Sequence, residues 1–260
     1  MLCHGALHLI LISIKILVIL QRFFSPIYNA TKMGESQQLR ELKSRHYIQD
    51  LIEEGEHEHQ DFKFQISDAR KIARSISAFA NNSGGHLLVG VKDNGRIAGV
   101  RSDEEIYMIE QAAQMYCRPP QKVQCTVYRV EGKSVLKVDI APADTLPVMA
   151  QDDDCRWRAY YRVADENVVA SALHVKIWKH RNAASPTVFT MTDSERTLIA
   201  HIENEGDVTL HDYSRLAHIT RATAEQSVIN LCAAGILTLR YHAGECYITS
   251  APSEPSHSSL

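Results

Sequence analysis

Hydrophobic residues change their spacing twice between positions 60 and 91, and each change predicts a new element. Residues 61–64 read Asp-Phe-Lys-Phe, and this alternation predicts a strand. Phe62 and Phe64 are then expected to point toward a core, and Asp61 and Lys63 to lie on the opposite face.

A helix is predicted next, because apolar residues recur at helical spacing after Ser67, the expected N-cap. Its apolar stripe consists of Ile72, Ile76, Phe79 and Ala80. The sequence Asn-Asn-Ser-Gly-Gly at 81–85 ends the helix, since glycine adopts backbone conformations that other residues avoid. Residues 87–91 form a continuous apolar run, which predicts a strand covered on both faces.

The remaining pattern mixes helices and strands, so we expect an α+β fold in which a mixed sheet has flanking helices. The expected helices are 103–115 and 172–180, and the expected strands are 123–130, 134–140 and 156–163. Beyond a linker at 183–190, the expected elements are helices 193–205, 210–218 and 221–234 and strands 236–240 and 245–249. Three helices and a hairpin are typical of a winged helix-turn-helix. We therefore expect a first domain at 33–182, a small winged-helix domain at 191–250 and a disordered tail at 251–260.

The first 32 residues differ from the rest. Residues 7–20 are nearly all Leu, Ile and Val, but a spanning helix needs about 20 apolar residues, and Lys15 interrupts the run. A signal peptide would show a basic start and a small-residue cleavage site, and neither is clear. Met33 opens an ordinary polar segment. We expect residues 1–32 to be an apolar extension ahead of the true start rather than a membrane anchor, and the protein to be cytoplasmic without a membrane partner.

Net charge and cysteine spacing limit the ways in which the protein could bind nucleic acid or metal. The formal net charge is −3, from 28 Lys and Arg against 31 Asp and Glu, so nucleic acid would have to be bound by local basic patches rather than by bulk charge. The six cysteines form no Cys-x-x-Cys pair, so neither a zinc site nor a disulfide framework is expected. Between Met191 and Ser250 there are four basic and eight acidic residues, which is unusual for a module that reads DNA.

Three carboxylates lie at the ends of predicted elements around one lysine. Glu56, Asp61 and Asp93 could converge near Lys63 and hold Mg²⁺ or Mn²⁺, with Lys63 stabilising developing negative charge. The alternative is that Asp93 is a turn residue and the other two are solvated. Glu56 lies an odd number of positions before Asp61, so the two meet only if the chain bends between them. No Gly-x-x-x-x-Gly-Lys-Ser/Thr loop is present, so ATP binding is not supported.

The same stretch resembles the Schlafen AlbA-type domain family, often described as DNA-binding in bacterial regulators. The matching residues are Glu56, Asp61-Phe62-Lys63, Ala78-Phe79-Ala80-Asn81, Gly84-Gly85, Gly90-Val91, Asp93, Gly95, Gly99, Tyr160-Tyr161-Arg162-Val163 and Ala170-Ser171. The resemblance covers about residues 50–171. It implies an AlbA-like fold and, from the animal nucleases of the family, an endoribonuclease site at Glu56, Asp61 and Asp93. The family usually has glutamate at the middle position, so Asp61 reaches one methylene less far.

Two sets of residues are candidates for nucleic-acid contact besides Lys63. On the strand at 156–163, Arg156, Arg158 and Arg162 alternate onto one face and could contact phosphates, or they could be ordinary solvated arginines. The predicted third helix of the C-terminal domain offers Arg221, Gln226 and Asn230 as reading residues.

Three functions fit these residues. The first is a nucleic-acid-binding regulator of transcription that contacts RNA or DNA. The second is a metal-dependent endoribonuclease acting on structured RNA through the three carboxylates. The third is a non-catalytic interaction module in which the C-terminal domain forms a homodimer.

Overall fold

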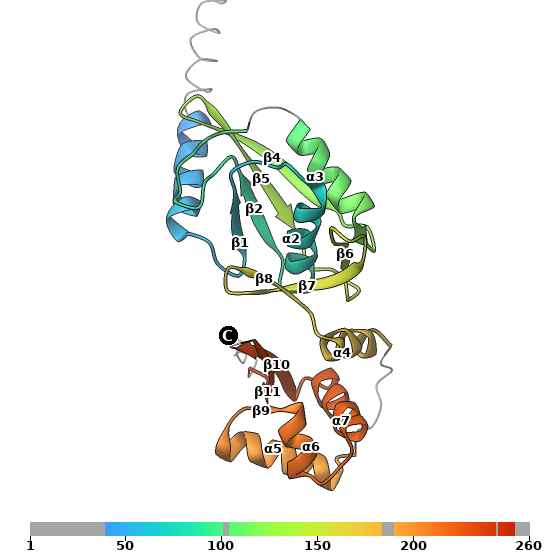
Figure 1. Cartoon of the computed structure of the whole chain (residues 1–260). Helices are drawn as coiled ribbons and strands as arrows, with labels where there is room; N and C mark the ends of the chain where they lie inside the picture. The colour runs from blue at the N-terminus through green and yellow to red at the C-terminus, as the bar shows by residue number, and fades with distance from the viewer. Residues whose placement is uncertain (1–39, 101–103, 184–189, 243, 253–260) are drawn as a thin grey trace, which may run out of the picture.

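The computed structural model describes residues 40–100, 104–183, 190–242 and 244–252. The predicted extension at 1–32 and most of the linker and tail lie outside these ranges. The described residues form a mixed α+β fold, as the sequence predicts (Figure 1). Their strands make three sheets, whereas the sequence predicts one mixed sheet and a C-terminal hairpin. No helix among them is long and apolar enough to cross a membrane.

The first sheet has the strand order β1-β2-β5-β4. Its strands are β1 (Gln60–Lys63), β2 (Gly85–Val89), β4 (Val123–Val130) and β5 (Lys133–Ile140). β1 and β2 are parallel, and the other neighbours are antiparallel. A helix at 40–54 covers one face, where Ile48 and Leu51 pack with Phe62 and Leu88. Leu87 and Val89 point to the other face and pack with α2 (Ala69–Asn81), so β2 is covered on both faces as predicted.

Helix α2 lies between the first sheet and a second one of order β3-β6-β7-β8 (Figure 1). The second sheet contains β3 (Cys117–Arg118), β6 (Met149–Gln151), β7 (Trp157–Val163) and β8 (Glu166–Val169). α3 (Glu104–Met115) packs against α2 beside β4. The predicted start of α2 was one residue early, because the N-cap is Asp68, whose side chain accepts the Arg70 N–H. Phe64 is 39% exposed rather than buried, because β1 ends at Lys63.

The C-terminal part contains the elements that the pattern predicted, and one more. It comprises α5 (Asp193–Glu205), β9 (Val208–Thr209), α6 (Leu210–Leu216), α7 (Arg221–Ala233), β10 (Leu237–His242) and β11 (Glu245–Ser250). The hairpin of β10 and β11 is extended by β9 into a three-stranded sheet. Thr192 and Glu195 form the predicted capping box at the start of α5. Whether this module acts as a winged helix-turn-helix stays a prediction.

Helix α4 (Ala172–Ala183) connects the two parts and packs along α7 (Figure 1). Ile177 belongs to the hydrophobic core of the C-terminal module, whereas Trp178 packs with Ala159 and Tyr161 of β7. The boundary predicted at 183–190 therefore follows a helix that already contributes to both cores.

Candidate functional site: a buried carboxylate–arginine network

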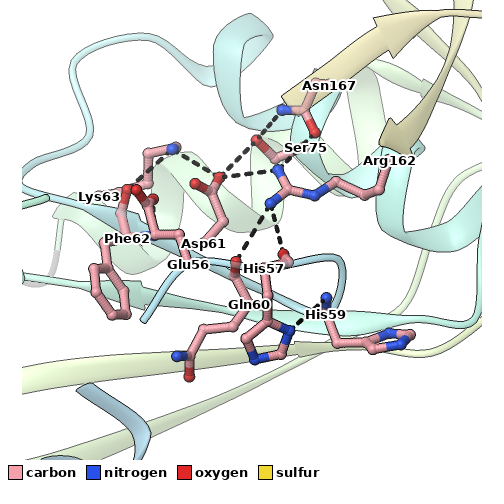
Figure 2. A network of polar contacts seen from close by, with 10 residues as sticks. All are labelled: Glu56, His57, His59, Gln60, Asp61, Phe62, Lys63, Ser75, Arg162 and Asn167. Carbon is pink, nitrogen blue, oxygen red and sulfur yellow. Dashed lines mark hydrogen bonds and ion pairs between the residues drawn. The ribbon is translucent and has the colours of Figure 1, made fainter. Parts of the chain in front are cut away.

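Four elements meet at one polar network on the α2 side of the first sheet. β1 supplies Asp61 and Lys63, α2 supplies Ser75, β7 supplies Arg162 and β8 supplies Asn167 (Figure 2). Asp61 and Lys63 share a face because they lie two residues apart on a strand. Ser75 of α2 contacts Asp61 on that face, so Asp61 is enclosed, whereas the Lys63 side chain remains 32% exposed.

Asp61 is only 4% exposed and is held by charged and polar partners. Its Oδ2 lies 2.7 Å from Lys63 Nζ and 3.9 Å from Arg162 Nη1, and the Ser75 hydroxyl donates to it over 3.5 Å. A buried carboxylate is costly unless it is paired. Two cations on one carboxylate therefore explain how Asp61 can be buried.

Glu56 reaches Asp61 because the chain bends between them, as the odd spacing required. His57 and Gln60 form an isolated bridge, and Gly55 has a φ of 74°. Glu56 Oε1 then accepts the Phe62 N–H over 2.8 Å. Burial raises the pKa of Glu56, and a hydrogen bond with Asp61 raises it further. Because like charges this close repel, Glu56 takes up a proton more readily than an exposed glutamate does.

Arg162 is a buried residue of this network and does not belong to an exposed phosphate-binding strand. Its side chain is 1% exposed, and its guanidinium donates to Asn167 Oδ1 and to the carbonyls of His57 and Gln60. Burial lowers its pKa, and the nearby Asp61 and Glu56 oppose that shift. The expectation that Arg162 lies on an exposed face of the strand is wrong, because α2 packs on that face of β7. Its contact with nucleic acid stays a prediction.

Asp93 is exposed in a turn where the Gly95 N–H donates to the Lys92 carbonyl. Within the described ranges, no three His, Cys, Asp or Glu side chains lie close enough to hold a metal ion. The cation beside Asp61 is the Lys63 ammonium. Glu56 and Asp61 without a third nearby carboxylate do not fit a Mg²⁺ or Mn²⁺ ion, and the three-carboxylate site stays a prediction.

Arg156 immediately precedes β7 and Arg158 is its second residue, and both lie in a cluster of arginines that the sequence only partly indicated. The arginine cluster consists of Arg70, Arg74, Arg118, Arg156 and Arg158, around the turn at 152–155. Arg70 and Arg74 lie one helical turn apart, off the apolar stripe of α2, and that spacing was the available signal. Arg118 follows the end of a helix, and nothing in its sequence neighbourhood indicates that it reaches β7.

Two aromatic rings and two aspartates organise the cluster. The Arg118 guanidinium lies 4.0 Å from the centre of the Trp157 ring, and that of Arg70 lies 5.2 Å from the Tyr116 ring. Arg158 pairs with Asp152 over 2.7 Å, and Arg74 pairs with Asp153 over 2.6 Å. Arg118 and Arg156 are exposed.

The three reading residues predicted on the third helix of the C-terminal module lie on α7. Arg221 and Gln226 are exposed, and the Gln226 amide donates to Asn230 Oδ1 over 2.9 Å. Glu225, on the same helix, pairs with Lys176 of α4 over 2.5 Å.

Comparison with known proteins places the first part of the chain. The family model described as Schlafen, AlbA_2 matches residues 56–171. The comparison with curated proteins gives no match.

Two solved structures are similar over part of their length. The DIP2311 protein from Corynebacterium diphtheriae is 20% identical with a TM-score of 0.38, and the match covers 66% of this chain and 32% of that one. The N-terminal domain of an ATP-dependent DNA helicase RecG-related protein from Nitrosomonas europaea is 20% identical with a TM-score of 0.34, covering 55% of this chain and 94% of that one. This chain thus spans about a third of the length of the first. The segment from residue 56 to residue 171, which carries the whole carboxylate–arginine network, belongs to the Schlafen, AlbA_2 family.

Proposed function

We propose that the protein is a nucleic-acid-binding regulator of transcription. The family match supports a nucleic-acid-related function. The observation that carries the proposal is the arginine cluster, which gathers five cations from α2, β3 and the start of β7 in a chain whose net charge is negative.

The cluster is suited to phosphate contact because its guanidinium groups are held in place. Arg118 is stacked on Trp157, and Arg74 and Arg158 are fixed by aspartates. Guanidinium groups match phosphate geometry through paired N–H donors. Arg156 has no side-chain ion pair among the described residues, so it and Arg118 are the two exposed cations that phosphates would reach first.

The test is binding of fluorescent duplex DNA and structured RNA by the full chain, measured by anisotropy at several salt concentrations. We expect Arg118→Ala with Arg156→Ala to weaken binding about tenfold or more and to reduce the log–log salt slope by about one to two, since each phosphate contact contributes roughly 0.9. Arg129→Ala is the matched control, because Arg129 is an exposed arginine on β4 in the first sheet. Equal affinity and slope in all proteins would refute the cluster as the binding surface.

A second candidate function, RNA cleavage, is favoured by the meeting of Glu56 and Asp61. A carboxyl group with a raised pKa beside a lysine is suited to proton transfer at a phosphodiester. Incubating structured RNA with wild type and Glu56→Gln, in Mn²⁺ or EDTA, tests it. Cleavage that is lost in Glu56→Gln while binding persists supports an endoribonuclease. An effect of Asp93→Ala would support the three-carboxylate site, and intact RNA in every lane would leave a binding protein.

A further inference from the structure

Helix α4 is attached to α7 along its length, although the sequence suggested that it ends the first domain. Lys176 pairs with Glu225, and the Arg181 guanidinium donates twice to the Cys232 carbonyl, over 3.2 and 2.7 Å. The contact partner on α7 moves from residue 225 to residue 232 as the position on α4 moves from 176 to 181, so the two helices run in the same direction. Ile177 packs between these contacts in the core that contains Ile229. α4 therefore covers one flank of α7.

The opposite flank of α7 is buried in its own module, where Ala224, Val228 and Leu231 pack. What remains open is a polar strip of α7 that includes Gln226 and Asn230. Lys176, Lys179 and His180 of α4 border a hollow whose other wall includes Ala222 and Gln226 of α7. A basic helix and a polar helix thus share one surface.

The charge of α4 reduces the main objection to DNA binding by the C-terminal module, which is its excess of acidic residues. Residues 172–183 contain Lys176, Lys179 and Arg181 and no acidic residue. Adding them to residues 191–250 changes the formal charge from −4 to −1. Lys176 also pairs with Glu225, which would otherwise repel phosphates from the open strip of α7.

The dimensions of B-DNA fit this pair of helices. The major groove is about 12 Å wide and admits one helix. Packed helices lie about 8–10 Å apart, so a neighbour of the inserted helix comes to lie over the strand that borders the groove. A-form RNA has a deep, narrow major groove that excludes a helix. The arrangement therefore fits a DNA duplex.

We propose that α4 and α7 form one binding surface for duplex DNA, in which Gln226 and Asn230 meet base edges in the major groove and Lys179 contacts the bordering phosphates. The side-chain amides of Gln and Asn pair with adenine edges, which favours sites with adenine at the contacted position. The proposal rests on the proposed nucleic-acid function and adds a second surface, with its own class of ligand.

The experiment uses the full chain and a pool of randomised 20-base-pair duplexes, from which wild type selects an enriched sequence. We expect Lys179→Ala to weaken binding several-fold on enriched and scrambled duplexes alike and to reduce the salt slope by about 0.9. Gln226→Ala should lose about fivefold or more on the enriched duplex and little on the scrambled one. Arg196→Ala is the control, since Arg196 is exposed on α5 of the same module.

The outcomes distinguish a failure of this proposal alone from a failure of the function on which it rests. One outcome would overturn the α4–α7 surface and keep the proposed function: Lys179→Ala and Gln226→Ala bind like wild type, while the Arg118 and Arg156 substitutions weaken binding. Binding of RNA but not of duplex DNA would overturn the surface as well. Absence of any nucleic-acid binding would overturn both. Lys179 is exposed, so thermal denaturation should show the variant to be folded.

Discussion

Asn81 uses its side-chain amide to join α2 to the second sheet. Its Nδ2 donates to the carbonyls of Val148 and Tyr160 over 2.8 and 2.7 Å, and its Oδ1 accepts the Val148 N–H over 2.7 Å. A buried amide with all of these bonds made fixes the end of the helix against two chain segments at once. This gives a physical reason for the asparagine in the Ala-Phe-Ala-Asn motif.

We expect Asn81→Leu to lower the free energy of unfolding by about 2–4 kcal/mol, because it leaves buried backbone groups unpaired. Urea denaturation followed by circular dichroism measures this change. Asn94→Ala is the control: Asn94 is an exposed turn residue, and its loss should cost less than about 1 kcal/mol. Equal losses in the two variants would contradict the role given to Asn81.

Residue alternation predicted that Asp61 and Lys63 share a face, but it could not predict what covers that face. The same limit explains why Arg162 is buried where an exposed position was predicted, since residues alternate in the same way on a solvated strand and on a strand covered by a helix. The bend that brings Glu56 to Asp61 was stated as a condition from the odd spacing. The bend itself forms through a backbone bridge between His57 and Gln60. No pattern of side chains in the sequence predicts such a bridge.

At the scale of elements, the turn from α2 to β2 depends on two adjacent glycines for different reasons. Gly84 has a φ of 78°, and a Cβ there would lie 2.8 Å from the Ile140 carbonyl oxygen. A Cβ on Gly85 would lie 2.5 Å from the Phe79 ring, which is in the core. The Gly-Gly motif thus lets the end of the helix pack directly on the start of the strand.

We expect Gly85→Ala to destabilise the fold by about 1–3 kcal/mol, because the added methyl overpacks the core against Phe79. Gly132→Ala is the matched control: it has nothing within 4 Å of the added Cβ, and only its φ of 75° opposes the change. Thermal denaturation of both variants compares the two. A Gly85→Ala protein as stable as wild type would show that the Phe79 ring and the His59 carbonyl, 2.6 Å from the added Cβ, both move without cost.

Long elements were predictable and short ones were not. α2, β2, β4, β5 and α5–α7 each extend over enough residues to show a period. β3 and β9 have two residues each, which is too few for any pattern, and the four residues of β8 do not alternate as residues 61–64 do. β3 pairs with β6, β8 with β7 and β9 with β11. The second sheet was therefore missing from the prediction, although its central strand β7 was present.

At the scale of the whole molecule, the two parts meet at α4, and one histidine lies in that junction. His174 is 8% exposed, its ring packs 4.7 Å from Tyr161 and 5.8 Å from Trp178, and its Nδ1 lies 3.1 Å from the Ser171 hydroxyl. Burial lowers the pKa of His174 from 6.5 to about 4. The folded junction therefore holds this imidazole neutral where an unfolded chain would protonate it.

This shift makes stability depend on pH in one direction. The unfolded state binds the proton first, so the contribution of His174 is complete above pH 6.5 and is lost as pH falls toward 4, by on the order of 3 kcal/mol. We expect His174→Gln, which cannot titrate, to lose less stability than wild type between pH 7 and pH 4.5. Urea unfolding at a series of pH values measures the difference. His211→Gln, at an exposed position, should follow wild type, and a His174→Gln curve parallel to wild type would show that the junction opens enough to hydrate the ring.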